Sequence, residues 1–175
     1  VESAKTMGFE LFTSLSVPFL GVSKSEAEKC LARLPEYLKA ERAVSIGEIG
    51  LDTAGDFEKW LFREHLRIAK DTGLPVILHT PIRMAPQSEK VLPQVLEIIK
   101  EENFPEDMCV FDHASEPNLE WRAKTGGMVG LSICWDKMPP ETAARWVIDN
   151  PDLRDRMIIN SELGGEGNDY FMVPR

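Results

Sequence analysis

The sequence of 175 residues lacks several features that mark particular classes of protein. No apolar run approaches the roughly 18 residues that a membrane-spanning helix needs, and the first residues contain no long apolar segment of a signal peptide. There are only three cysteines, Cys30, Cys109 and Cys134, and no short spacing relates them. This pattern argues against a disulfide framework and favours a reducing compartment. We therefore expect a cytoplasmic protein that does not interact with membranes.

Basic side chains are also fewer than acidic ones. The sequence has 20 Lys and Arg residues against 29 Asp and Glu residues, and its formal net charge is −9. Because non-specific affinity for nucleic acid depends on cationic side chains, we do not expect a broad phosphate-binding surface. A nucleic-acid substrate whose phosphate is held by a metal ion remains compatible with this charge.

Short apolar segments alternate with amphipathic segments along the whole sequence, which predicts a parallel α/β architecture. Strands are expected at residues 11–17, 43–49, 75–79, 108–113, 128–134 and 157–160. Helices are expected at residues 23–41, 56–72, 88–102, 118–124 and 140–149. Most of the strand segments are continuously apolar, as expected when both faces of a sheet are covered.

Some of these helices carry recognisable end signals. Ser23 and Glu26 have the spacing of a capping box at the start of the first helix. Gly73 directly follows the second helix, where glycine is favoured as a C-terminal cap. Pro35 inside the first helix is expected to kink it or to split it in two.

Six strands are fewer than the eight of a complete (β/α)8 barrel, which usually needs at least about 200 residues. The sheet is therefore either an open doubly wound sheet or a TIM-type (β/α) barrel of which about six of eight strands are represented. We predict the barrel, with residues 1–175 forming a single barrel-type domain that lacks the first strands. Because an incomplete barrel exposes a sheet edge, we also expect either a segment missing from this sequence or a partner chain, such as a second copy in a homo-oligomer.

Acidic and imidazole side chains stand at the ends of four predicted strands. These residues are Glu48, His79, His113 and Glu162. The carboxyl ends of parallel strands lie at one edge of the sheet, where functional sites form. Imidazole and carboxylate groups suit zinc, manganese or iron. The pattern therefore predicts a site for one or two divalent metal ions, with zinc favoured.

Structural roles are the alternative for each of these side chains. Glu48 can pair with a cation, His79 can cap a buried strand, and His113 can form local hydrogen bonds. His65, the third histidine, lies at core-facing helical spacing and is interpreted as structural. Asp52 can either orient a metal ligand or cap its loop through an Asx-type turn.

Several segments resemble the TatD-like branch of the amidohydrolase superfamily. The first three are SIGEIGLD at 45–52, LPVILHT at 74–80 and VFDH at 110–113. IINSE at 158–162 and NDYFMVP at 168–174 resemble an uncharacterised, largely archaeal and bacterial subgroup of that family. The resemblance covers about residue 34 to the C-terminus.

The resemblance implies a metal-dependent hydrolase on a TIM-type barrel, in which metal-activated water attacks a phosphoester or a related ester or amide bond. The family's bridging glutamate maps to Glu48, and the two histidines that hold one ion map to His79 and His113. Glu162 stands where a final-strand acid holds the other ion and orients the attacking water. The implied substrates are small-molecule esters or phosphoesters, or nucleic acid.

This sequence departs from the family pattern at two functional positions. The His-x-His pair that begins the family's first strand is not present. The final-strand acid is Glu162 where the family has aspartate, and Asp169 is a second candidate for the catalytic acid. A catalytically silent metal-binding barrel or scaffold protein is therefore the main alternative function. An α/β enzyme that uses no metal is a further alternative.

Overall fold

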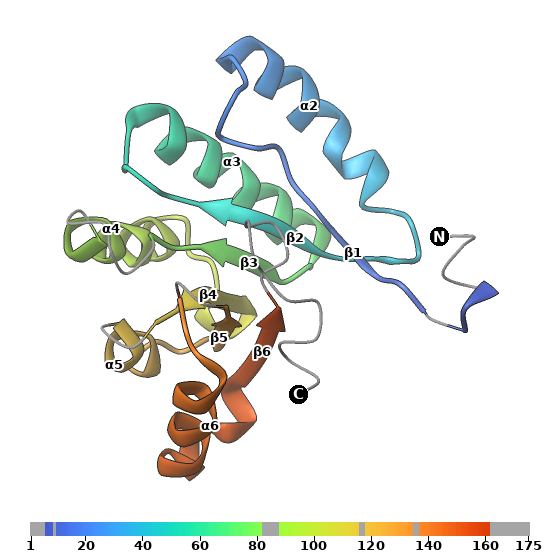
Figure 1. Ribbon diagram of the computed structural model, residues 1–175. Helices are drawn as coiled ribbons and strands as arrows, with labels where there is room; N and C mark the ends of the chain where they lie inside the picture. Colours follow the sequence, from blue (N-terminus) through green and yellow to red (C-terminus); the bar gives the residue numbers. More distant parts are fainter. Residues whose placement is uncertain (1–5, 9, 82–87, 116–117, 135–136, 162–175) are drawn as a thin grey trace.

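The computed structural model describes residues 6–8, 10–81, 88–115, 118–134 and 137–161 (Figure 1). In these residues one sheet contains six parallel strands, in the order β1-β2-β3-β4-β5-β6. The strands are β1 (Thr13–Leu15), β2 (Ala43–Gly50), β3 (Val76–His79), β4 (Cys109–Ala114), β5 (Met128–Ile133) and β6 (Met157–Ser161). Because the order never reverses, the doubly wound alternative is wrong: such a sheet has a switch point at which its order turns back.

Helices connect successive strands and lie on the convex side of the curled sheet (Figure 1). The α-helices of the described residues are α2 (Lys24–Tyr37), α3 (Asp56–Thr72), α4 (Ser88–Glu101), α5 (Leu119–Ala123) and α6 (Pro140–Asp149). Two 3₁₀ helices, η1 (Glu106–Met108) and η3 (Pro151–Arg156), precede β4 and β6. The predicted parallel α/β architecture is confirmed. Within the described residues, no helix combines the length and apolar character needed to cross a membrane.

Local signals account for several of the observed helix ends. At the start of α2, the hydroxyl of Ser23 accepts the backbone N–H of Glu26, whose carboxylate accepts the backbone N–H of Ser23. The predicted capping box is therefore confirmed. Gly73 ends α3 in the left-handed conformation, with φ of 69°. Pro35 lies near the end of α2, which continues through it to Tyr37 as one helix.

The main core lies between the sheet and helices α3 and α4. Its buried side chains include Ile46, Ile49, Val76, Leu78 and Phe111 of the strands, Phe62 and Leu66 of α3, and Val95 and Ile99 of α4. A second apolar cluster packs α6 against β5, and a third joins α2 to α3. Because the apolar side chains of the central strands pack against these helices, the polar side chains at the carboxyl ends of those strands are left together at one edge of the sheet.

Most strands were expected to be covered on both faces, and β6 is less covered than the central strands. The side chains of β6 are half-buried or exposed, and Ile159 retains 50% of its accessible surface. In the described residues the helices cover only the convex side of the sheet. The side chains of β6, an edge strand, are therefore less buried than those of the central strands. The first strand is also shorter than predicted, because only Thr13–Leu15 pair with β2.

Candidate metal centre

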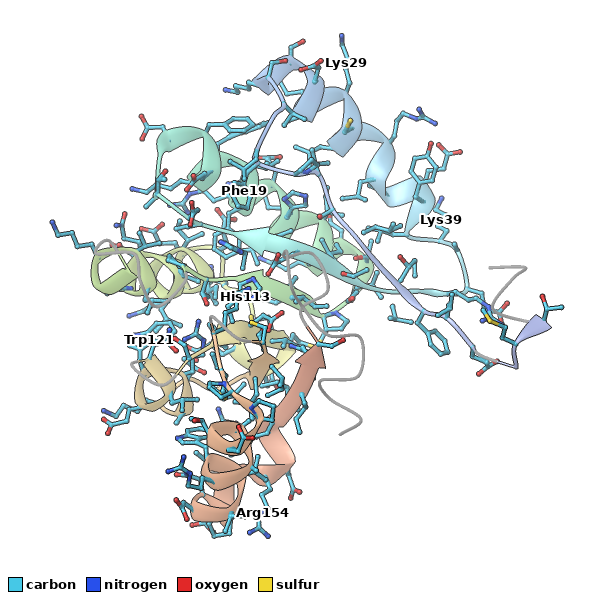
Figure 2. All side chains as sticks on the ribbon, viewed as in Figure 1. Phe19, Lys29, Lys39, His113, Trp121 and Arg154 are labelled. Carbon is cyan, nitrogen blue, oxygen red and sulfur yellow. The ribbon has the colours of Figure 1, made fainter. Side chains whose placement is uncertain are left out.

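Three side chains from three neighbouring strands meet at the carboxyl edge of the sheet. Glu48 lies on β2 and His79 ends β3. His113 lies on β4 (Figure 2). The Oε1 atom of Glu48 is 2.6 Å from His113 Nε2 and 3.5 Å from His79 Nδ1. The two imidazole rings meet edge to face, with centroids 5.0 Å apart. Ligand atoms of all three residues lie within 4.8 Å of one another, a span that a single metal ion can bridge.

An irregularity in β2 brings Glu48 to this position. From Ile46 to Ile49 the strand advances three residues, whereas its partners on β3 advance only two, from Val76 to Leu78. The extra residue is a β-bulge, which bends a strand and re-aims the side chains beside it. The side chain of Glu48 is 39% exposed, although the residues around it on β2 are buried.

Glycines flank Glu48 because β3 lies too close for larger residues. A Cβ atom at Gly47 would come within 2.7 Å of the Ile77 Cβ atom. A Cβ atom at Gly50 would come within 2.3 Å of the His79 carbonyl oxygen, and Gly50 has φ of 143°. The glycines therefore permit the close approach of β2 and β3 that places Glu48 beside His79.

β4 carries a matching irregularity at its own histidine. Between Phe111 and Ala114 this strand also contains one residue more than β5, its partner. His113 lies in that interval with φ of 60°, in the left-handed region that bulky residues rarely adopt. Such a conformation costs about 1–2 kcal/mol and must be held by the surrounding structure.

One carboxylate oxygen connects the strand ends around His113. The Asp112 Oδ1 atom accepts the backbone N–H of His113 at 2.7 Å, the Ser132 hydroxyl at 2.9 Å and the Asn160 side-chain amide at 2.7 Å. This links β4 to both β5 and β6. The Nδ1 atom of the His113 ring, which is the nitrogen that does not face Glu48, is 3.3 Å from the Ser132 hydroxyl and 2.9 Å from the Nζ atom of the buried Lys137.

The fully buried side chain of Arg122 also forms hydrogen bonds at the ends of these strands. The Arg122 Nη2 group donates to the hydroxyl of Thr80 and to the Asp112 carbonyl oxygen. Burial lowers the pKa of Arg122 to about 9, and the charge of Asp112 acts in the opposite direction. In the described residues, Nε and Nη1 of Arg122 have no hydrogen-bond partner.

The surroundings of Glu48 fit a divalent cation. Burial acts to raise the pKa of its carboxyl group, but hydrogen bonds and charge from His113 and His79 outweigh burial and hold that pKa well below its usual range. Within the described residues, the ion-pair partners of Glu48 are these two imidazoles, and no Lys or Arg side chain neutralises it. An ionised carboxylate beside two imidazoles is a donor set for zinc, manganese or iron.

The structure thus brings together three of the four predicted metal ligands. The fourth, Glu162, and the candidate catalytic residue Asp169 lie outside the described residues. His65 lies away from this cluster in the core, where Nε2 accepts the backbone N–H of Val17 and Nδ1 contacts the Leu61 carbonyl oxygen. These contacts agree with its interpretation as a structural residue.

Sequence reasoning missed the residues that support the histidines. Asp112 was visible only as the neighbour of His113, and nothing local indicated its bonds to Ser132 and Asn160. Arg122 and Lys137 are both buried, whereas isolated basic residues in amphipathic segments are usually exposed. The signal available in the sequence was the position of Ser132 and Asn160 on β5 and β6, the two strands that follow β4 in the sheet.

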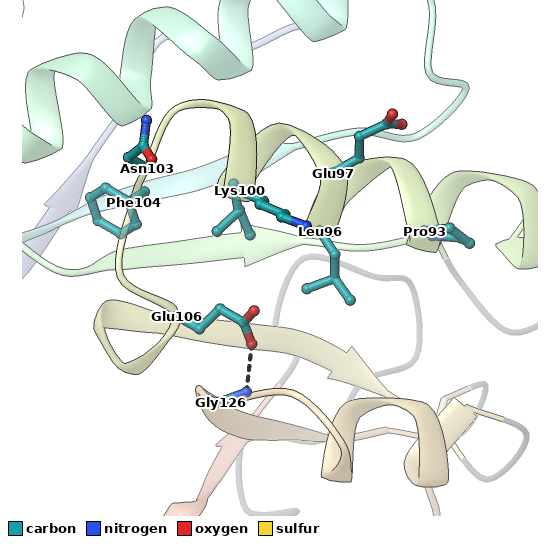
Figure 3. A pocket seen from close by; sticks show the side chains of 9 residues that line it. Pro93, Leu96, Glu97, Lys100, Asn103, Phe104, Glu106 and Gly126 are labelled. Atoms are coloured by element: carbon teal, nitrogen blue, oxygen red, sulfur yellow. Dashed lines mark hydrogen bonds between the residues drawn. The ribbon is translucent and has the colours of Figure 1, made fainter.

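A hollow of about 740 Å³ lies at the other end of the sheet, along α4 (Figure 3). Its lining includes Phe104, Glu106 and Gly126, which precede β4 and β5, and the Glu106 carboxylate accepts the Gly126 N–H at 2.6 Å. The carboxyl ends of the strands, where Glu48 and the two histidines lie, are at the opposite edge. This hollow is therefore separate from the candidate metal centre.

Residues 1–152 match the model of the TatD related DNase family. The chain belongs to this family. It is 31% identical over 176 residues to the uncharacterized metal-dependent hydrolase MJ0761 of Methanocaldococcus jannaschii, covering 100% of this chain and 67% of that protein. The predicted resemblance is confirmed.

Solved structures of TatD-like proteins share the fold. The TatD-like protein AF1765 of Archaeoglobus fulgidus superposes with a TM-score of 0.69 and 26% identity, over 89% of this chain and 59% of that chain. The TatD homologue YjjV of Escherichia coli K12 superposes with a TM-score of 0.62 and 23% identity, over 94% of this chain and 65% of that chain. The TIM-type barrel with six parallel strands is therefore confirmed as the fold. This chain spans about three fifths of the Archaeoglobus structure.

Proposed function

We propose that this TatD family member is a metal-dependent hydrolase whose divalent ion is held by Glu48, His79 and His113. The observation that carries the proposal is the meeting of one carboxylate oxygen and two imidazole nitrogens from three adjacent strands. Two histidines and one glutamate form a ligand set of catalytic zinc sites, in which a further position stays open for water. Zinc is the proposed metal, with manganese and iron as alternatives, at one or two ions per chain.

A bound divalent ion would supply Lewis acidity and would lower the pKa of coordinated water to about 7. The protein supplies an ionised Glu48 carboxylate on the exposed side and two shielded imidazoles behind it, whose side chains are 15% and 6% exposed. This arrangement leaves the carboxylate side accessible to substrate. It also restricts the two rings to a narrow range of orientations, as efficient catalysis requires.

We propose a phosphoester or a related ester or amide as the substrate class. The family name points to phosphodiester chemistry. The net charge of −9 opposes binding along an extended nucleic acid, because few cationic groups are available to replace counterions. A small phosphoester, or a short nucleic-acid segment that reaches the metal with one phosphate, suits this charge better.

Glu162 and Asp169 are the proposed catalytic acids, and Glu162 is also the proposed fourth metal ligand. Glu162 directly follows β6 in the sequence, and functional sites of parallel sheets form from residues that follow their strands. We also propose that residues 1–175 act as one barrel-type domain in a reducing, cytoplasmic compartment. The three cysteines, Cys30, Cys109 and Cys134, are odd in number and have no short spacing, which supports that compartment.

The test is the metal content of protein purified without chelators, measured by elemental analysis together with hydrolysis of a chromogenic phosphodiester. We expect one or two equivalents of metal, retained in a His65→Gln control and lost in His79→Ala. We also expect Glu162→Gln to lower kcat by roughly 10²–10⁴-fold, the usual contribution of a general acid or base.

Two results would change this conclusion. Metal that depends on His79 but supports no turnover would indicate the catalytically silent metal-binding barrel or scaffold protein. Absence of metal, even after incubation with excess zinc, would overturn the metal site and the hydrolase proposal with it.

A further inference from the structure

The two ring nitrogens of His79 face two different carboxylates. Nδ1 lies 3.5 Å from Oε1 of Glu48, on the side of the candidate metal centre. Nε2 lies 3.7 Å from Oδ1 of Asp52. Nε2 is buried and has no hydrogen-bond partner within the described part of the chain. Phe19 packs against the same ring, with centroids 5.5 Å apart, and limits its movement.

A neutral imidazole carries one N–H group and one lone pair. If the lone pair of His79 Nδ1 faces a cation beside Glu48, the proton must be on Nε2. A buried N–H group without an acceptor costs about 1–3 kcal/mol. Asp52 supplies an acceptor on that side. Its distance of 3.7 Å is longer than a hydrogen bond of about 2.9 Å, so the Asp52 side chain, which is 40% exposed, must rotate slightly inward to form the bond.

The loop that carries Asp52 is organised by a buried glutamate of α3. The Glu58 carboxylate accepts the backbone N–H groups of Asp52, Thr53 and Ala54 at 3.1, 2.9 and 2.8 Å. It also accepts the hydroxyl of Thr53 at 2.8 Å. Ala54 has φ of 59°, a left-handed conformation that these bonds hold in place. The loop therefore has a defined shape that sets Asp52 beside the end of β3.

These contacts decide between two roles for the Asp52 side chain. A loop-capping role would require its carboxylate to accept N–H groups of its own loop, but Glu58 accepts them. In the described residues, the charged partner of the Asp52 carboxylate is His79. The geometry thus favours an interaction with the imidazole over capping.

We propose that Asp52 is a positioning residue that accepts the Nε2–H group of His79 and thereby directs Nδ1 toward the metal. Carboxylate groups of this kind fix the tautomer and the orientation of a ligating imidazole, and they raise its basicity. The inference rests on the proposed metal site and adds a residue that acts through a ligand. Asp52 itself does not contact the ion.

The test compares Asp52→Asn, Asp52→Ala and the control Asp71→Asn, which removes an exposed acid from the far end of α3. Zinc alone is the probe, and its affinity is measured by competition with a chromophoric chelator. We expect Asp52→Ala to weaken zinc binding about 10–100-fold, which is the usual effect of losing such a partner. Asp52→Asn retains an acceptor oxygen and should lose less, and Asp71→Asn should match the wild type.

Two further readouts separate positioning from a general structural role. Nitrogen-15 NMR of the zinc-loaded wild type should show the His79 proton on Nε2, with a shift that changes in Asp52→Ala. The visible spectrum of the cobalt-substituted protein should change in the same variant. The melting temperature of the metal-free Asp52→Asn protein should stay at the wild-type value, because Asp52 is partly exposed.

Several results would overturn this inference while leaving the proposed metal site intact. They are unchanged zinc affinity in Asp52→Ala, zinc bound through His79 Nε2, or loss of one whole equivalent of zinc in Asp52→Asn. The last result would make Asp52 a ligand. If the wild type itself binds no zinc, the proposed function and this inference both fail.

Discussion

At the scale of single residues, His65 ties the stability of the fold to pH. The imidazole is 1% exposed, its Nε2 accepts the backbone N–H of Val17, and its Nδ1 faces the Leu61 carbonyl oxygen. This pattern requires the neutral tautomer with the proton on Nδ1. Burial lowers the pKa of His65 to about 4, and the bond to Leu61 opposes the decrease. Protonation of Nε2 would break the bond from Val17, which joins the segment after β1 to α3.

We therefore predict that the free energy of unfolding decreases as the pH falls from 6.5 to about 4. In that window the unfolded chain binds a proton at this histidine and the folded chain does not, so acid favours unfolding. The contribution of His65 is fully present above the unfolded pKa and amounts to about 3 kcal/mol. Urea unfolding of the wild type and His65→Gln at several pH values measures it, because glutamine keeps an acceptor but does not titrate. A difference between the two proteins that is independent of pH would contradict the prediction.

At the scale of elements, the site depends on how closely β2 and β3 pack. Gly50 pairs with His79 across these strands, and a Cβ atom there would overlap the His79 carbonyl oxygen at 2.3 Å. The three atoms nearest to that Cβ position are all backbone atoms of His79, so a substitution must separate the strands or twist them. Such a movement displaces His79 relative to Glu48, on the adjacent strand.

We predict that Gly50→Ala weakens zinc binding and also destabilises the protein by about 1–3 kcal/mol, as overpacking usually does. Gly73→Ala is the matched control: Gly73 also has a positive φ, but a Cβ atom there meets nothing within 4 Å. It should lose about 1–2 kcal/mol from backbone strain alone and retain wild-type zinc affinity. Chelator competition and urea unfolding of both variants measure these effects. Wild-type zinc affinity in Gly50→Ala would show that the close packing does not position His79.

At the scale of the whole molecule, the six-stranded sheet has two open edges. Among the described strands, β1 and β6 each pair with one neighbour only. Large apolar side chains are exposed beside them, including Phe12 at 58% and Ile159 at 50%. Unpaired strand edges with apolar neighbours are templates for association with another chain. The net charge of −9 opposes association by mutual repulsion.

We predict that the chain of 175 residues self-associates in a concentration-dependent manner, more strongly at high salt because salt screens the repulsion. A charge on the edge should oppose pairing, so Ile159→Lys should shift the equilibrium toward monomer. Ile148→Lys is the control, since Ile148 is 65% exposed but lies on α6 and not on an edge strand. Sedimentation velocity at several protein concentrations measures the effect. A monomer at every concentration and salt would contradict this prediction.

The elements with strong local signals were predicted almost to the residue. Helix α3 begins and ends where the sequence indicated, because its periodic apolar face is followed by Gly73. Strand β1 was predicted too long, since its apolar run continues beyond Thr13–Leu15, the residues that β2 can pair. A run of apolar residues indicates that a strand can form, but the neighbouring strand decides where it ends.

The candidate site was predictable in part for a similar reason. Glu48, His79 and His113 each stand at or near the end of an apolar segment, and parallel strands bring such ends together. The groups that hold the histidines were not predictable, because their partners are distant in sequence. Asn160 is 48 residues from Asp112, and no local pattern links the two.

The sequence by itself determined the order of strands and helices, the capping of α2, and the imidazole and carboxylate chemistry at the strand ends. These features depend on periodicity and on neighbours within a few residues, so they can be read from short segments. Only the tertiary structure decided which nitrogen of His79 faces Glu48 and which faces Asp52. It also decided that Glu58, and not Asp52, organises the intervening loop. Such choices depend on bulges and packing between separate strands, whose ångström-scale distances are set only when the whole sheet is assembled.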